Sequence, residues 1–286
     1  MAAALALKEP PLEIPAGIEL EHLAVTIGTV VHGIDLREPL TPSTANYLKA
    51  LMLERQVLFF RDQDLTVEQH MTVCRNWGEL EIIPFLPQLP GQPEVLHIKR
   101  DADNKPYENV WHSDVTWRTE PSFGSMLRAI EVPALGGDTL FCDMYAAYDG
   151  LPSHLKRACE GLQAVHSITV GLGLFTPPDV LYEQSKKFPP ATHPVIRTHP
   201  ETGRKLIYVN RAHTQYIKGM RRDDSNTLLE QLYSRANTPE YQCRFKWQKN
   251  SIAFWDNRAC QHYAAADYFP QNREMYRVTI VGDKPF

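Results

Sequence analysis

The residues best suited to chemistry fall in two clusters that lie far apart in the sequence. The first is His112-Ser113-Asp114, and the second ends at His262. The segment around His112 is rich in aromatic and β-branched residues, which favours a strand. Alternate residues of a strand point to one face, so His112 and Asp114 can bind one metal ion from the same side. With His262 they would form the two-histidine, one-carboxylate face that is typical of non-haem Fe(II) oxygenases, because it leaves other coordination positions open.

Two arginines and a threonine add to this set. Arg273 follows His262 by eleven residues, Arg277 comes four later, and Thr139 closes the run Gly136-Gly137-Asp138-Thr139. The residues from 276 to 281 alternate like a half-buried strand. If that strand extends back to Arg273, both guanidinium groups point to the same buried side. Buried guanidinium groups need anionic partners, which would be internal carboxylates or bound anions.

On these residues the chain resembles the taurine dioxygenase family of Fe(II)- and 2-oxoglutarate-dependent dioxygenases, which includes alkylsulfatases and aryloxyalkanoate dioxygenases. The resemblance runs from about Gly33 to the end of the chain. The segments that carry it are Gly33-Ile34-Asp35-Leu36, Val57-Leu58-Phe59-Phe60-Arg61-Asp62-Gln63, Trp111-His112-Ser113-Asp114, Gly136-Gly137-Asp138-Thr139, His193-Pro194-Val195, Thr198-His199-Pro200, Trp255-Asp256-Asn257-Arg258 with Gln261-His262, and Gly282-Asp283-Lys284-Pro285.

The resemblance implies a fold, a reaction and roles for these residues. The fold would be mainly β with flanking helices, a double-stranded β-helix (jelly roll) of the clavaminate synthase-like type. His112, Asp114 and His262 would bind Fe(II), while Arg273 and Thr139 would hold the far carboxylate of 2-oxoglutarate. With O₂, the enzyme would hydroxylate an organic anion and release succinate and CO₂, and the product would collapse to a carbonyl compound.

The resemblance also implies that Arg277 holds the anionic head of the substrate, which would be an alkyl sulfonate, a sulfate ester or an aryloxyalkanoate. Two positions depart from taurine dioxygenases themselves. Ile83 stands in a region where those enzymes carry histidines, and Asn109 belongs to a different polar stretch before the metal motif. We therefore predict that Ile83 and Asn109 help to bind a larger and more apolar substrate than taurine.

Composition narrows the class of protein. The chain has 286 residues, of which 43% are hydrophobic, so it can bury the core of a full domain. A net charge of -4 gives no basic surface for nucleic acid. The sequence lacks a run near the roughly 18 apolar residues of a membrane span. We expect a small-molecule enzyme without nucleic-acid or membrane partners, and a homo-oligomer (dimer or tetramer). The five cysteines are an odd number without a C-x-x-C pair, which favours reduced thiols in the cytoplasm.

The elements that must position the site follow from local signals. Residues 1–16 are predicted to be a flexible tail, and 17–286 a single domain. Helices are expected from Thr41 as N-cap, over 66–77, over 144–162 with a break at Pro152, and over 223–235. Strands are expected at 57–60, 244–247, 251–255 and 276–282. Prolines near 83–107 and missing periodicity over 167–192 predict lid loops.

Two other functions fit parts of the pattern. A zinc hydrolase could use two histidines, a carboxylate and a bound water, but it would have no need for Arg273 and Thr139. A non-catalytic barrel that binds a ligand would have no need for a complete ligand set.

Overall fold

The computed structural model describes residues 14–83, 86–171, 173 and 176–286. The tail predicted at 1–16 falls mostly on residues 1–13, which lie outside the described residues. No helix in the described ranges is long and apolar enough to cross a membrane.

Eight strands form the larger sheet, in the order β1-β2-β3-β14-β6-β16-β5-β4. Their bounds are Glu19–His22 (β1), Thr29–His32 (β2), Val57–Phe60 (β3), Ile252–Asp256 (β14), Gly124–Glu131 (β6), Arg273–Ile280 (β16), Gln92–Arg100 (β5) and Gln88–Leu89 (β4). Neighbouring strands are antiparallel, except that β2 and β3 are parallel. The strands predicted near 57–60, 251–255 and 276–282 are therefore confirmed, with β16 beginning at Arg273 as expected.

A smaller sheet, β13-β7-β15, faces the larger one. It consists of β13 Gln242–Phe245, β7 Thr139–Asp143 and β15 Cys260–Ala264. The core between the sheets shows the two-residue period of strands. In β3, Val57 and Phe59 belong to this inner core, whereas Leu58 and Phe60 pack on the outer face. Two sheets around one core, with helices outside, confirm the mainly β prediction.

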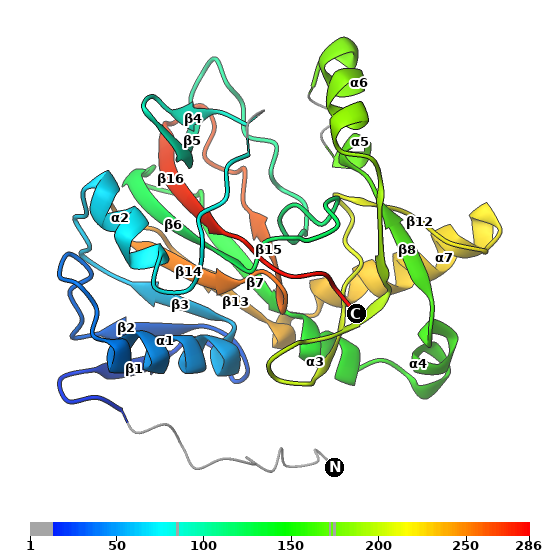
Figure 1. The fold of residues 1–286 in the computed structure, drawn as a ribbon, viewed down its shortest axis with the longest axis horizontal. Helices are drawn as coiled ribbons and strands as arrows, with labels where there is room; N and C mark the ends of the chain where they lie inside the picture. Colours follow the sequence, from blue (N-terminus) through cyan, green and yellow to red (C-terminus); the bar gives the residue numbers. More distant parts are fainter. Residues whose placement is uncertain (1–13, 84–85, 172, 174–175) are drawn as a thin grey trace.

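Two helices cover the outer face of the larger sheet, α1 Pro42–Arg55 and α2 Val67–Cys74 (Figure 1). Thr41 caps α1 by accepting a hydrogen bond from the Thr44 amide, and Pro42 begins the helix as predicted. Thr66 and Gln69 form a capping box on α2. Leu48 and Met52 of α1 pack against the sheet and fix the helix there.

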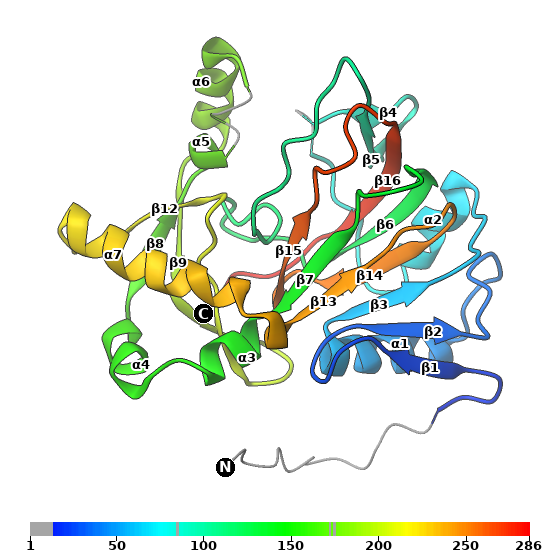
Figure 2. The ribbon, with the colours of Figure 1, turned by 180° about the vertical axis from the view of Figure 1, so that it is seen from behind.

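The remaining chain forms a second lobe beside the smaller sheet (Figure 2). Its strands are β8 Gln163–His166, β9 Ala191–Pro194 and β12 Thr214–Ile217 in one sheet, and β10 Ile196–Thr198 with β11 Lys205–Ile207 in another. Its helices are α3 Met144–Asp149, α4 Ser153–Cys159, α7 Arg222–Tyr233 and the 3-10 turns η2 Ser234–Asn237 and η3 Pro239–Tyr241. The predicted break at Pro152 separates α3 from α4.

Both segments predicted as loops contain regular structure. In 83–107, β4 and β5 extend the larger sheet, so the loop prediction is wrong for those residues. Pro93 precedes Val95–Arg100, the part of β5 that pairs with β16, so its missing N–H costs the ladder nothing. In 167–192, α5 Ile168–Gly171 and α6 Pro178–Lys187 are short helices. In both views α6 stands out from the body, and none of its side chains is buried (Figures 1 and 2).

Candidate active site

The structure brings together the three predicted metal ligands. One ligand atom each from His112, Asp114 and His262 lies within 4.8 Å of the others. His262 comes from β15, where it pairs in register with Phe141 of β7. His112 and His262 exchange two backbone hydrogen bonds, of 3.1 and 2.8 Å, as an isolated β-bridge. This bridge holds the two histidine ligands side by side.

The strand or strand edge predicted around His112 is reduced to a single β-bridge. Only His112 makes a β-bridge, and residues 114–117 form a turn in which Val115 has a φ of 47°. A β-branched residue in the left-handed region is strained and must be held by its surroundings. The turn begins at Asp114, so the pairing with β15 ends just after His112, while the ligand atoms of His112 and Asp114 lie together as predicted.

Asp114 and His262 have the protonation states that metal binding needs. His112 Nδ1 donates to the carbonyl oxygen of Val110 at 2.8 Å, which leaves Nε2 free to bind a metal ion. Burial, together with nearby His112, holds the pKa of His262 well below its usual value, so the ring is neutral. Burial alone raises the pKa of Asp114, but the positive charge of Arg277 outweighs burial, lowers this pKa below its usual value and keeps the carboxyl ionised. Neutral imidazoles and a carboxylate are suited to Fe(II).

Arg277 contacts the metal ligand Asp114 directly. Its Nη1 donates to Asp114 Oδ1 at 2.8 Å, while its Nε is buried without a hydrogen-bond partner among the described residues. The same guanidinium lines the cavity described below. The structure thus gives Arg277 an internal carboxylate partner, and its predicted role toward a substrate anion stays a prediction.

Unlike Arg277, Arg273 has no carboxylate partner among the described residues. It is 6% exposed, and its Nε and Nη2 have no hydrogen-bond partner in the described chain. Within that chain it also forms no ion pair. Its Cζ lies 5.9 Å from the centre of the Trp247 ring, and Trp247 Nε1 donates to Thr139 Oγ1 at 2.9 Å. Trp247 therefore connects the two residues predicted to hold 2-oxoglutarate, and the unsatisfied donors of Arg273 fit a carboxylate ligand.

A cavity of about 480 Å³ opens beside the metal ligands. Its wall includes His112, Asp114, Arg277 and the predicted Asn109, together with mostly apolar side chains such as Trp117. The wall does not include Ile83, Thr139 or Arg273. Ile83 packs one layer behind it, in a cluster with Leu96, Val115, Trp117 and Ile168. Arg273 lies next to the wall, because its register partner on β5 is Arg100, which lines the cavity.

Polar residues of this wall that the sequence did not reveal include His213, Arg211 and Arg100. His213 is buried, its Nδ1 has no partner among the described residues, and burial with nearby His112 lowers its pKa to about 3. Arg211 is paired with Glu230 of α7, at 2.6 and 2.8 Å. Arg100 forms an ion pair with Glu108. None of these residues stands in a motif, so no local signal could have found them.

Comparison with known proteins now gives the family. Residues 19–279 match the family model described as "Taurine catabolism dioxygenase TauD, TfdA family". The chain belongs to this family. The relatives include a sulfate ester dioxygenase of Pseudomonas putida, which is 32% identical over 99% of this chain and 94% of its own. A 2,4-dichlorophenoxyacetate dioxygenase of Cupriavidus pinatubonensis is 33% identical over 88% of this chain and 94% of its own. Both are named as dependent on alpha-ketoglutarate, which is 2-oxoglutarate.

A solved structure agrees with these relatives. The protein AAD-2, in complex with Mn(II) and N-oxalylglycine, is 33% identical, with a TM-score of 0.81 over 94% of this chain and 98% of its own. The jelly-roll prediction is thereby confirmed. This TauD, TfdA family member is an Fe(II)- and 2-oxoglutarate-dependent dioxygenase that uses O₂, and the zinc hydrolase and the non-catalytic barrel are set aside.

Proposed function

We propose that this dioxygenase hydroxylates an organic anion: an alkyl sulfonate, a sulfate ester or an aryloxyalkanoate. Succinate and CO₂ are the other products. When the hydroxylated carbon bears the heteroatom, the product collapses to a carbonyl compound and a released anion or phenol. The observation that carries the proposal is the cavity beside His112 and Asp114, in which Arg277 offers a cation within a mostly apolar wall. An anionic head and an apolar body together match such a site.

In this proposal His112, Asp114 and His262 would hold Fe(II). The bound Fe(II) would activate O₂, with 2-oxoglutarate as the cosubstrate that is oxidised. Arg273 and Thr139 hold the far carboxylate of the cosubstrate. The planar guanidinium of Arg273 provides two unsatisfied donors, which suits a bidentate contact to a carboxylate. Trp247 orients Thr139 through its indole N–H, so the threonine hydroxyl hydrogen remains available to the cosubstrate.

The substrate end of the cavity has its own donors. Arg277 keeps one nitrogen on Asp114 and turns the rest of its guanidinium to the cavity, where it binds the substrate anion. His213 stays neutral at physiological pH, because its pKa is about 3, and its unpaired Nδ1 offers a second polar contact. Asn109 lies at the exposed part of the wall. Ile83 shapes the apolar part indirectly, by packing behind Leu96 and Trp117.

The segments that we expect to move over the substrate are residues 101–110 and the helix α5. The first segment contributes Tyr107, Glu108, Asn109 and Val110 to the cavity wall, and α5 contributes Val170 and Gly171. We further propose a cytoplasmic enzyme that acts as a homo-oligomer.

The test is a comparison of matched anions and neutral analogues. Hexyl sulfate, hexanesulfonate and phenoxyacetate are each assayed for stimulated consumption of 2-oxoglutarate and formation of succinate, with Fe(II) and O₂ present. Hexanol and phenoxyacetamide are the neutral controls, and the His262→Ala variant gives the background. We expect at least one anion to stimulate turnover while its neutral partner does not. Equal stimulation by the neutral partner would contradict the proposed anion site.

A further inference from the structure

We propose that Asn257 is a positioning residue that holds the metal ligand Asp114 by its backbone. This inference rests on the proposed metal site and assigns a role outside the ligands themselves. Asn257 is fully buried, in the turn between β14 and β15. Its Oδ1 accepts a hydrogen bond from the Asp114 amide at 2.6 Å, and its Nδ2 donates to the Asp114 carbonyl at 2.9 Å and to the Ser122 carbonyl at 3.2 Å.

The two hydrogen bonds from the Asn257 side chain to the Asp114 backbone form a clamp, which begins where the backbone pairing ends. At His112 the loop is attached to β15 by two backbone hydrogen bonds. Ser113 adds a contact from its Oγ to the Cys260 carbonyl at 2.9 Å. At Asp114 the chain turns away into the strained conformation of Val115, so a strand ladder cannot continue. The carboxamide of Asn257 has the donor and acceptor of a peptide group, and it replaces the missing strand partner.

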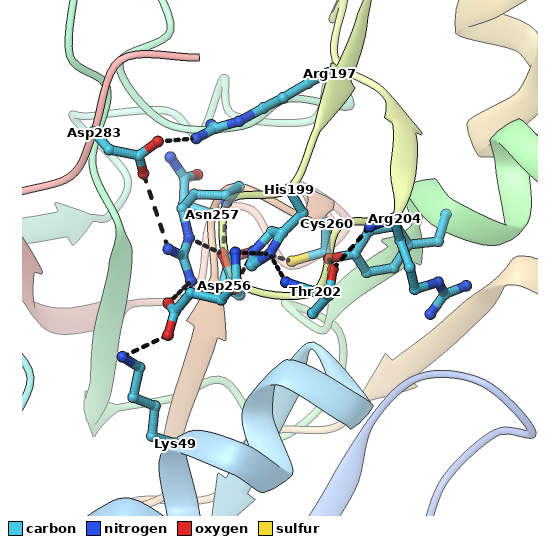
Figure 3. A network of polar contacts seen from close by, with 12 residues as sticks. Lys49, Arg197, His199, Thr202, Arg204, Asp256, Asn257, Cys260 and Asp283 are labelled. Atoms are coloured by element: carbon cyan, nitrogen blue, oxygen red, sulfur yellow. Dashed lines mark hydrogen bonds and ion pairs between the residues drawn. The ribbon is translucent and has the colours of Figure 1, made fainter. Parts of the chain in front are cut away.

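Asn257 is itself held in place by a buried ionic network (Figure 3). Its neighbour Asp256 is fully buried and accepts hydrogen bonds from Arg258 at 2.8 and 2.9 Å and from His199 Nε2 at 3.0 Å. Arg258 also pairs with Glu201 at 2.9 Å, and Glu201 pairs with Lys49 of α1 at 2.7 Å. The Asn257 amide donates to the Phe123 carbonyl at 3.0 Å. The turn therefore has little freedom, and the direction of the Asn257 side chain is fixed.

The consequence is a defined position for the Asp114 carboxylate. Without Asn257, the amide and carbonyl of Asp114 and the carbonyl of Ser122 lose their buried partners. The loop would then rearrange to satisfy these groups and relieve Val115, and the carboxylate would leave the face formed with His112 and His262. Partners that orient metal ligands typically change metal affinity about 10- to 100-fold when they are removed. We expect this loss of affinity for Asn257→Ala.

Gln63 provides a matched control. It is also buried, and it makes the same kinds of bonds far from the site: Oε1 accepts from the Leu36 amide at 2.8 Å, and Nε2 donates to the carbonyls of Ile34 and Arg61 at 3.1 and 2.8 Å. Gln63→Ala therefore removes the same number of hydrogen bonds, two of them partly buried, without touching the metal loop. Its stability should fall like that of Asn257→Ala, whereas its metal affinity should stay within about twofold of the wild type, as expected for independent sites.

The experiment is a calorimetric titration of the metal-free proteins with Co²⁺ alone, with thermal melts of the same samples. Asn257→Ala should bind Co²⁺ about 10- to 100-fold more weakly than both the wild type and Gln63→Ala. If the two variants melt alike and bind Co²⁺ alike, Asn257 is only structural and the proposal is wrong. A wild type that fails to bind Co²⁺ would instead contradict the metal site. Should the alanine variant not fold, Asn257→Ser is titrated in its place, and wild-type affinity there refutes the clamp.

Discussion

Replacing Arg273 by leucine tests how the cosubstrate is anchored. The guanidinium is buried, and its Nε and Nη2 are unsatisfied within the described residues. If both donate to the far carboxylate of 2-oxoglutarate, Arg273→Leu removes two hydrogen bonds between charged groups. Each contributes about 1.5–3 kcal/mol, so the loss is about 3–6 kcal/mol, or about 10²- to 10⁴-fold in the dissociation constant.

The assay is equilibrium binding of 2-oxoglutarate to the protein loaded with Mn²⁺, which reports affinity without turnover. Arg128→Leu is the control, because Arg128 is equally buried but lies on β6 and pairs with Asp64 at 2.8 Å and with Asn250 at 2.9 Å. This control should lose stability and keep the affinity for 2-oxoglutarate. Arg273→Leu should lose affinity for 2-oxoglutarate and keep its stability. The stability is kept because, in the ligand-free protein, the substitution removes a buried charge that has no partner among the described residues.

An unchanged dissociation constant in Arg273→Leu would refute this reasoning. The cosubstrate would then be anchored elsewhere, and the role that the family resemblance implies for Arg273 would be wrong. A loss of affinity shared equally by the two variants would point to general destabilisation. Only the contrast between them supports the anchor.

Three further perturbations follow from the same geometry. His262→Ala should abolish Fe(II)-dependent turnover and leave a folded protein by circular dichroism, since it removes one of three ligands; near-normal turnover would contradict the triad. Arg277→Leu should weaken binding of the anionic substrate about 10- to 100-fold, because one charged hydrogen bond is lost, and should leave the affinity for 2-oxoglutarate unchanged. A lower melting temperature with unchanged substrate affinity would mean that Arg277 acts only through Asp114. Burial, with the charge of Arg128, lowers the pKa of His70 to about 3 from 6.5, so the unfolded chain binds a proton that the folded chain rejects as the pH falls below 6.5. Unfolding by urea should therefore show that His70→Gln reduces the stability lost between pH 7 and pH 5 by about 2 kcal/mol; the same loss in both proteins would disprove this coupling.

We expect the choice of substrate to depend on a few charged side chains of the cavity wall. Three arginines line the cavity, and each already has a carboxylate partner: Asp114 for Arg277, Glu108 for Arg100 and Glu230 for Arg211. A substrate anion must therefore compete with, or add to, an existing ion pair. Because the Arg211 pair is half exposed, its strength is modest and depends on salt. Arg277 is buried, so we expect its proposed interaction with the substrate anion to be stronger than that of Arg211.

Features that depend on neighbouring residues and on short periods could be predicted from the amino-acid sequence. The cap at Thr41 and the break at Pro152 follow from the local conformations of those residues. The alternation from Arg273 to Thr279 predicted one buried face for both arginines, and the strand burial agrees. The types of the three metal ligands were also evident, because few chemistries use two histidines and one carboxylate in this way.

The way in which these groups come together depends on contacts between residues that are distant in the sequence. His112 and His262 become neighbours through one long-range β-bridge. The local sequence around either residue does not predict such a pairing. Asp114 begins a strained turn that is held by Asn257 from the connection between β14 and β15, although the local residues favoured a strand. The prolines near β5 favoured the prediction of a loop, whereas in the structure β5 is a strand that pairs with β16. In each case contacts between distant residues outweighed local preference, because burial and hydrogen bonding in the folded core are worth more than the small propensities of single residues.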